Sequence, residues 1–229
     1  MHAEEAVTEL YLHQVPYYMD SPENGTYVDL MQGFTEQFGH QFDLKMASSE
    51  RIEKLLVLGV KEFCSLGFSV ELAASEGLPT GHLVESQSFN RIHTSILSHK
   101  NLPINRVNDL HQRVLVVYHG NVKDAEERLP ERVEVSIVTV SSLDALIKVV
   151  INQRVDAGFV TSPDILMSPY YKQEQSQLHL VDLPNSNRRE SLVCFNSPKL
   201  RLLVKRFDQY LETLRQSDEL KQYIEYKAR

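Results

Sequence analysis

The sequence alternates between short apolar segments and longer segments whose apolar residues recur at helical spacing. Strand-like segments in the first half cover residues 9–14, 42–46 and 62–66, and helix-like segments lie between them and end at Gly39 and Gly59. In the second half, strand-like segments at 113–118, 133–140 and 155–160 alternate with helix-like segments at 122–128 and 143–150. Two β-α-β-α-β series predict an α/β fold built on parallel strands.

The remaining segments suggest how the two series are connected. An extended, alternating segment at 90–99 follows a polar, irregular stretch, as a crossover between two lobes would. Two further strands are expected at 178–183 and 191–195, and the second could return the chain to the first lobe. A helix over 200–214 and a short helix around Tyr223 close the chain. A length of 229 residues is enough for two lobes of about 100 residues each.

Composition excludes several classes of protein. The net charge of −7 argues against a nucleic-acid partner or an anionic membrane surface. No apolar run approaches the roughly 18 residues that a membrane-spanning helix needs. The first residues, Met1 to Glu5, are typical of a sequence that starts just after a removed leader, so we expect an exported, periplasmic protein.

The chain has two cysteines and nine histidines, residue types that can form disulfides or bind metal ions. Cys64 and Cys194 both lie in apolar, strand-like runs. They read either as two buried thiols, which we favour unless the strands are neighbours, or as one disulfide of an exported protein. No pair of histidines has the His-x-x-x-His spacing, and no nucleotide or nucleophile motif is present, so we expect no metal, no cofactor and no catalytic residue.

The stretch from Gly59 to Ser75 bears most directly on function. It predicts a buried strand at 62–66 that breaks at Gly67 into a loop. In open α/β sheets, ligands bind just beyond the carboxyl ends of strands. We therefore expect the loop at 67–75, with Ser69 and Glu71, to face a binding cleft.

Five short motifs, in order along the chain, resemble those of the family 3 extracellular solute-binding proteins, the polar amino-acid binding proteins of ABC transporters. They are Pro16-Tyr17-Tyr18, Asn24 to Met31 (NGTYVDLM), Leu58 to Phe63 with Glu62 in an acidic place, Asn108-Asp109-Leu110 followed by RVLVVYHGN, and Arg154-Val155-Asp156-Ala157. The resemblance implies a two-lobe, periplasmic-binding-protein-like (type II) α/β fold with two hinge crossovers. Its lobes would be residues 1–95 plus 190–229, and residues 96–189. It also implies that the strands carrying the cysteines share a lobe, which keeps a disulfide open as the alternative.

This chain departs from the family pattern at the residues that hold an α-amino acid. The arginine that clamps the ligand carboxylate falls on Ala74, and a threonine falls on Glu71. In the second lobe, the carboxylate-binding Ser or Thr falls on Asn121, and the aspartate that holds the α-ammonium falls on Thr161. Burying a carboxylate without its arginine costs several kcal/mol, so we expect a cationic or neutral polar ligand rather than an ordinary α-amino acid.

Several residues are candidates for ligand binding. Each also has an ordinary structural interpretation. The tyrosines could pack against neighbouring loops, Glu71 and Arg91 could be solvated surface charges, and Gly120 and Asn121 could form a strand-to-helix turn. The candidates are Tyr17, Tyr18, Ser69, Glu71, Arg91, Gly120, Asn121 and Thr161.

Three functions remain open from the sequence. The first is a non-catalytic, monomeric binding protein that delivers a small polar solute to an ABC-transporter permease or a membrane receptor. The second is a degenerate two-lobe module for sensing or protein interaction without a classical ligand. The third is a dehydratase-like enzyme on the same scaffold, with Glu71 as its catalytic carboxylate.

Overall fold

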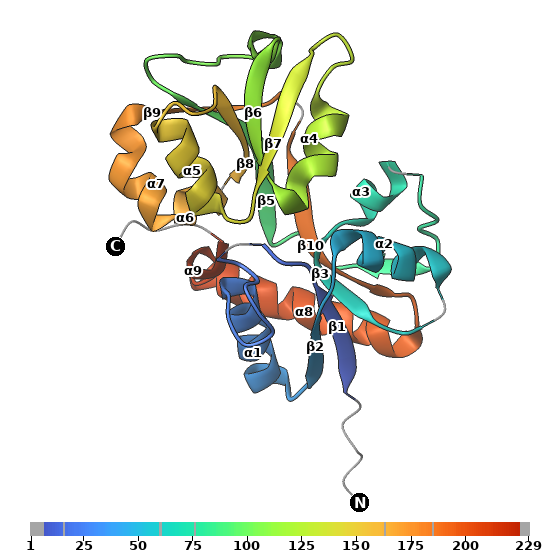
Figure 1. The fold of residues 1–229 in the computed structure, drawn as a ribbon. Coiled ribbons are helices and arrows are strands. Elements are labelled where there is room, and N and C mark those ends of the chain that lie inside the picture. Colours follow the sequence, from blue (N-terminus) through green and yellow to red (C-terminus); the bar gives the residue numbers. More distant parts are fainter. Residues whose placement is uncertain are drawn as a thin grey trace, which may run out of the picture. The chain divides into compact units, whose positions relative to one another are not determined.

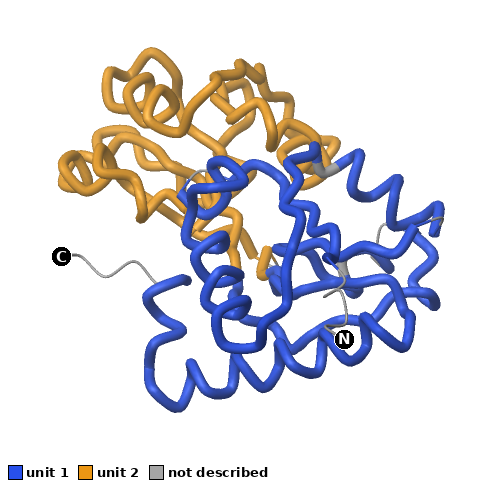
Figure 2. The backbone as a smooth tube through the Cα atoms, turned by 90° about the horizontal axis from the view of Figure 1, so that it is seen from below, with its two compact units in different colours: residues 1–91, 188–229 blue, residues 92–187 orange. Residues whose placement is uncertain are grey.

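The structure is a computed structural model that describes residues 7–15, 17–59, 61–75, 77–162, 164–184 and 186–224. It divides into two compact units, residues 1–91 with 188–229 and residues 92–187 (Figures 1 and 2). The chain passes between the units twice, at 91–92 and at 187–188. The boundaries expected from the sequence, 95/96 and 189/190, fall inside strands β5 (Asn90–His99) and β10 (Arg188–Phe195).

Unit 1 contains a mixed sheet in the order β2-β1-β3-β10, with β4 paired to β10. Strands β1, β2 and β3 are parallel, and β10 runs antiparallel to β3. The elements not yet bounded are β1 (Thr8–Leu12), α1 (Thr26–Phe38), β2 (Phe42–Met46), α2 (Ser49–Leu58), β3 (Cys64–Phe68), α3 (Val70–Ser75), β4 (Leu83–Glu85), α8 (Pro198–Gln216) and α9 (Lys221–Ile224).

The order of these strands sends helices to both faces of the unit 1 sheet. The chain moves outward from β1 to β2 and then back past β1 to β3, so right-handed crossovers place α1 and α2 on opposite faces. On the α2 side, Ile52 and Leu56 pack with Tyr11 and Phe63. On the other side, α1 meets α8, and the rings of Phe34 and Phe207 lie 5.5 Å apart.

Local sequence explains where these helices begin and end. Helix α1 follows Gly25, whose φ of 134° and close approach leave no room for a side chain: a Cβ there would lie 2.2 Å from the carbonyl oxygen of Tyr18. The same helix ends at Gly39 in the left-handed conformation. Helix α2 is capped by Ser48, which accepts a hydrogen bond from the Arg51 N–H.

Unit 2 has a sheet in the order β5-β8-β6-β7, with β9 paired to β5. Strands β6, β7 and β8 are parallel, and β5 is antiparallel to β8 and β9. Its other elements are η1 (Val107–Leu110), β6 (Arg113–Tyr118), η2 (His119–Asn121), α4 (Val122–Arg128), β7 (Val135–Val140), α5 (Leu143–Ile151), β8 (Ala157–Ser162), α6 (Asp164–Met167), α7 (Pro169–Glu174), η3 (Gln175–Gln177) and β9 (Leu178–Asp182). Leu115, Val117 and Phe159 form the middle of its core.

The expectation for residues 62–75 was wrong in two respects. The third strand begins at Cys64 rather than Glu62 and continues through Gly67 to Phe68. Gly67 does not end the strand. It adopts a φ of 78°, which glycine tolerates, and the strand continues to Phe68. The segment expected as a loop contains helix α3, whose sequence VELAAS is rich in good helix formers.

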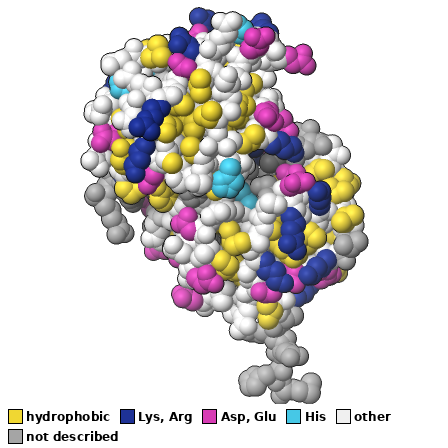
Figure 3. Space-filling view, viewed as in Figure 1, with side chains coloured by type: hydrophobic (Ala, Val, Ile, Leu, Met, Phe, Trp, Pro, Cys, Tyr) yellow, Lys and Arg dark blue, Asp and Glu magenta, His cyan; other side chains and the backbone are white. Residues whose placement is uncertain are grey.

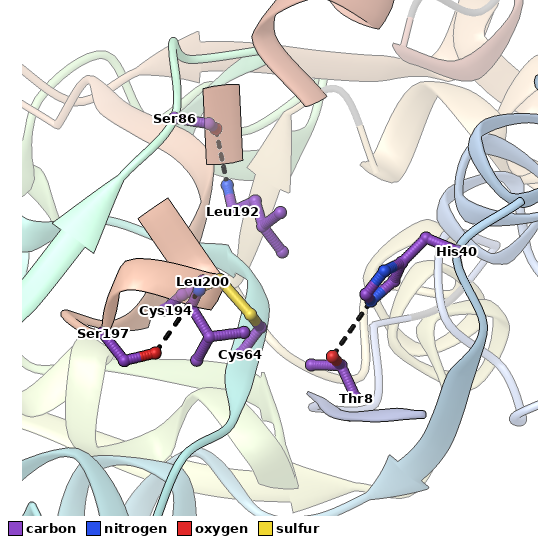
Figure 4. The surroundings of a disulfide bond; sticks show 8 residues. All are labelled: Thr8, His40, Cys64, Ser86, Leu192, Cys194, Ser197 and Leu200. Carbon is purple, nitrogen blue, oxygen red and sulfur yellow. Dashed lines mark hydrogen bonds between the residues drawn. A yellow bond between two sulfur atoms is a disulfide. The ribbon is translucent and has the colours of Figure 1, made fainter. Parts of the chain in front are cut away.

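The favoured reading of the two cysteines as thiols was also wrong, because they form a disulfide. Cys64 and Cys194 lie directly opposite each other in the antiparallel pair β3–β10, with Cα atoms 4.0 Å apart (Figure 4). Both residues are fully buried, and the chain between them is long, with a sequence separation of 130. The bridge therefore ties β3, in the first segment of unit 1, to the returning strand β10.

Candidate functional site

In unit 1, the parallel strands β1 and β3 end at the same edge of the sheet, where α/β proteins place their ligands. His13 and Tyr17 follow β1 at this edge, and Ser69 and α3 follow β3. Of the predicted site residues, Tyr17, Ser69 and Glu71 thus follow strands that end at this edge, and Pro16 lies outside the described residues.

The start of α3 has little chemistry with which to hold an anion. Ser69 is buried, with 3% of its surface exposed. Glu71 is exposed in the first turn of the helix, where a negative charge interacts favourably with the helix dipole. Ala74, at the place of the family arginine, is exposed and has no polar group.

A carboxylate of the chain itself occupies the first turn of α3. Glu85, at the end of β4, accepts hydrogen bonds from the backbone N–H of Val70 and from the hydroxyl of Ser191. Burial raises the pKa of Glu85, and the nearby charge of Glu71 raises it further, while Arg189 opposes the shift. Glu85 was not predicted from the sequence, where its only signal is an acidic residue at the end of a short apolar run.

The structure separates the two candidate tyrosines. Tyr18 is buried inside unit 1, 1% exposed, with its ring 4.7 Å from that of Tyr27 and its hydroxyl donating to the carbonyl of Ile224 at 3.3 Å. Tyr17 is only partly buried and has a φ of 70°, a rare conformation for an aromatic residue. Its N–H donates to Asp20 at 3.1 Å. The packing role weighed for these residues applies to Tyr18, and Tyr17 remains the candidate.

Arg91 is exposed at the first chain crossing, and its backbone N–H donates to the side chain of Asn90 at 2.8 Å. This contact does not involve the guanidinium group, so a ligand-binding role of Arg91 stays a prediction.

In unit 2, two of the predicted residues meet. Strands β6 and β8 are parallel neighbours, so the residues that follow β6 lie close to the end of β8. Asn121 donates from its side-chain amide to the hydroxyl of Thr161 at 3.4 Å, and both residues are partly buried. Gly120 beside them is exposed. This pair offers neutral donors and acceptors, whereas the family pattern has a charged aspartate at the place of Thr161.

A second acidic residue in unit 1 was not anticipated. Glu190, on β10, is 4% exposed and accepts hydrogen bonds through Oε2 from Tyr27 and from Asn90. Burial raises the pKa of Glu190 to about 7. Burial lowers the pKa of His13 to about 4, although part of that residue stays exposed. No pattern in the sequence identifies Glu190, because its partners lie 163 and 100 residues away.

The described residues contain no group of three or more His, Cys, Asp or Glu side chains that could hold a metal ion. Nor does any helix within the described part have the length and apolarity to cross a bilayer. On the face shown in Figure 3, basic and acidic side chains are interspersed rather than gathered into a block of one sign.

Comparison with solved structures identifies the fold. The chain is similar to the GluR0 ligand-binding core in complex with L-glutamate, with 15% identity, a TM-score of 0.70, and coverage of 96% of this chain and 97% of that one. It is similar to the GluR0 ligand-binding core from Nostoc punctiforme, also with L-glutamate, at 15% identity, a TM-score of 0.68, and coverage of 94% and 96%. A third similar structure is an amino acid ABC transporter substrate-binding protein from Streptococcus pneumoniae bound to L-arginine, at 17% identity, a TM-score of 0.65, and coverage of 96% and 93%.

No family model matches the sequence, and no curated protein matches it. The structural likeness nevertheless extends over nearly the whole chain in both directions, so both units take part in it. This chain therefore has the two-lobe α/β fold of the amino-acid substrate-binding proteins and the GluR0 ligand-binding cores.

Proposed function

We propose that this protein is a non-catalytic solute-binding protein whose ligand is a small cationic or neutral polar molecule rather than an ordinary α-amino acid. The fold supports the binding role, since the similar structures are substrate-binding proteins or ligand-binding cores. The bound solute would be passed to an ABC-transporter permease or a membrane receptor. A location outside the cytoplasm fits the disulfide, which persists in oxidising compartments.

The observation that carries the ligand class is the chemistry at the start of α3. The Val70 N–H donates to the chain's own Glu85 carboxylate, and Glu71 adds a second negative charge nearby. A ligand carboxylate entering here would meet two acids and, at Ala74, no guanidinium group to pair with it. A charged group buried without its partner costs several kcal/mol, which would remove most of the affinity for an amino acid.

In unit 2, Asn121 and Thr161 suit a neutral polar group. Their side chains already contact each other at 3.4 Å, and together they present an amide and a hydroxyl. Tyr17 would supply an aromatic face, which binds cations as well as apolar surface.

A thermal-shift screen followed by calorimetry tests this proposal. The panel contains the twenty amino acids, amines that lack a carboxylate, and neutral polyols. We expect a hit among the last two classes, because a ligand at 100 times its Kd stabilises the protein by about 2.7 kcal/mol. Tight binding of any ordinary amino acid would contradict the proposed ligand class.

A pair of variants then tests the site. For a cationic hit, Glu71→Gln should weaken binding, while Glu36→Gln, on the exposed side of α1, should leave it unchanged. Equal affinities of the two variants for that hit would exclude Glu71 from the site.

The degenerate interaction module remains the second candidate, because Glu85 already satisfies the Val70 N–H without any ligand. A broad screen without a hit would favour it over the solute-binding role.

A further inference from the structure

Three buried polar side chains of unit 1 form a closed network. The amide of Asn90 donates to the Tyr27 hydroxyl at 2.6 Å and to Glu190 Oε2 at 2.7 Å. The Tyr27 hydroxyl donates to the same Oε2. Tyr27, Asn90 and Glu190 are 1%, 7% and 4% exposed. The network joins three elements, α1, β5 and β10, that are far apart in the sequence.

The network lies beside both places where the chain leaves unit 1. Asn90 is the first residue of β5, just before the crossing at 91–92, and Glu190 follows the crossing at 187–188. The backbone joins them as well, because the Phe89 N–H donates to the Glu190 carbonyl at 2.9 Å. Tyr27 packs its ring against Phe89 with centroids 5.0 Å apart. Movement of either crossing segment therefore disturbs the same three side chains.

Glu190 has hydrogen-bond donors but no basic partner in this network. The groups that act on its ionisation are burial, which is the largest, and the hydrogen bonds from Tyr27 and Asn90. Its other oxygen, Oε1, lies near Gly67, where a Cβ would be 3.5 Å from Oε1 and 3.4 Å from the His13 ring. Burial keeps His13 neutral near pH 7, since its pKa falls to about 4. The pKa of Tyr27 is raised, so that residue is neutral as well.

Among the described residues, the titratable groups near this carboxyl group are Tyr27 from α1, Tyr18 next to Tyr27, and His13 after β1. Asn90 from β5 and Gly67 from β3 do not titrate. Ionisation of Glu190 places a negative charge in a buried site where the described residues provide two neutral donors and no cation. Burial therefore outweighs the two hydrogen bonds and raises the pKa of Glu190 to about 7.

We propose that the Tyr27–Asn90–Glu190 network is a proton-dependent latch on the two chain crossings of unit 1. With Glu190 protonated, the buried carboxyl group carries no charge, and the network holds both crossing segments against α1. With Glu190 ionised, the carboxylate gains hydration when the segments around it open, so local opening of residues 88–91 and 188–190 becomes more frequent.

Amide hydrogen exchange of Phe89 measures this opening directly, because that N–H bonds to the Glu190 carbonyl. Protection factors, corrected for the intrinsic pH dependence of exchange, are compared at pH 6 and pH 8. If Glu190 titrates near 7 in the closed state and near its ordinary 4.5 in the open state, the protection of Phe89 falls about tenfold over this range. The Ala47 amide, which donates to the Leu12 carbonyl at 2.9 Å elsewhere in unit 1, is the internal reference.

Two variants complete the test. Glu190→Gln keeps an acceptor for both donors and cannot ionise, so the protection of Phe89 should become independent of pH. Tyr27→Phe keeps the ring and removes a donor that lowers the pKa of Glu190, so the loss of protection should shift to higher pH. Glu36→Gln should behave as the unaltered protein. A constant Phe89 protection factor in the unaltered protein, or equal losses at Phe89 and Ala47, would overturn the latch.

Discussion

Removal of the disulfide is the sharpest test of the unit 1 architecture. We consider the double variant Cys64→Ala, Cys194→Ala, which removes the bridge without leaving an unpaired thiol. The bridge stabilises the folded protein mainly by lowering the conformational entropy of the unfolded chain. The size of its effect depends on how much of the enclosed chain is flexible when β3 and β10 separate.

Two limits bracket the expected loss. If the whole chain unfolds together, the closed loop has a sequence separation of 130, and the loop entropy corresponds to about 5 kcal/mol at 25 °C. If unit 2, residues 92–187, stays folded, only about 30 residues of the loop are flexible, and the loss is about 4 kcal/mol. The small difference follows from the logarithmic dependence on loop length.

Urea unfolding followed by circular dichroism gives the measurement, with the unaltered protein, the same protein under reducing conditions, and the double variant. We expect the reduced protein and the variant to lose about 4–5 kcal/mol of unfolding free energy. Thiol counting in denaturant without reductant should find none in the unaltered protein. Two reactive thiols, or a loss under about 1 kcal/mol, would refute the reasoning.

Three further predictions concern single residues. The pKa of Glu190 is raised from 4.5 to about 7, so its contribution to stability is complete below pH 4.5 and is lost as the pH rises to about 7. Between these pH values, the unfolding free energy of the unaltered protein should fall by about 3 kcal/mol relative to that of Glu190→Gln, as measured by urea titrations at each pH. A difference in unfolding free energy that does not change with pH would contradict the raised pKa of Glu190. Because the lowered pKa of His13 acts in the opposite direction, only the comparison with the variant isolates this effect. Gly25→Ala should lower Tm by several degrees, because the new Cβ would meet a carbonyl oxygen at 2.2 Å; an unchanged Tm would mean that the turn adapts. Ser142→Ala should lower the unfolding free energy measured in urea by about 1 kcal/mol, because the Ser142 side chain caps α5 by accepting from the Ala145 N–H at 3.1 Å. The control Ser141→Ala should lower it by almost nothing. Equal effects of the two variants would argue against the cap.

Elements with a strong local signal were predictable from the sequence. The strand at 90–99, the strand at 113–118 and the helix at 122–128 have the expected bounds. Periodicity and β-branched residues determine such elements almost without tertiary help. Helices α6 and α7 were not anticipated, because four and six residues are too few to show a helical period.

The site was predictable only where a motif aligned its residues. Glu71, Ala74, Asn121 and Thr161 were selected in that way, and the structure adds the contact between the last two. Glu85 could not be found, because its role depends on β4 pairing with β10 and lying beside α3. The buried contacts of unit 1 join residues from both ends of the chain, and no local pattern records such pairings.

The insertion of unit 2 into the chain of unit 1 sets an order for biosynthesis. Unit 2 is a single continuous segment, 92–187, so all of its strands are available before the last part of the chain has been made. Unit 1 must wait for β10 and α8, which complete its sheet and cover it. Until residue 194 emerges, Cys64 stays an unpaired thiol at the edge of an incomplete sheet. The nascent chain therefore needs protection from mixed disulfides with other molecules and from strand-to-strand aggregation for most of its synthesis.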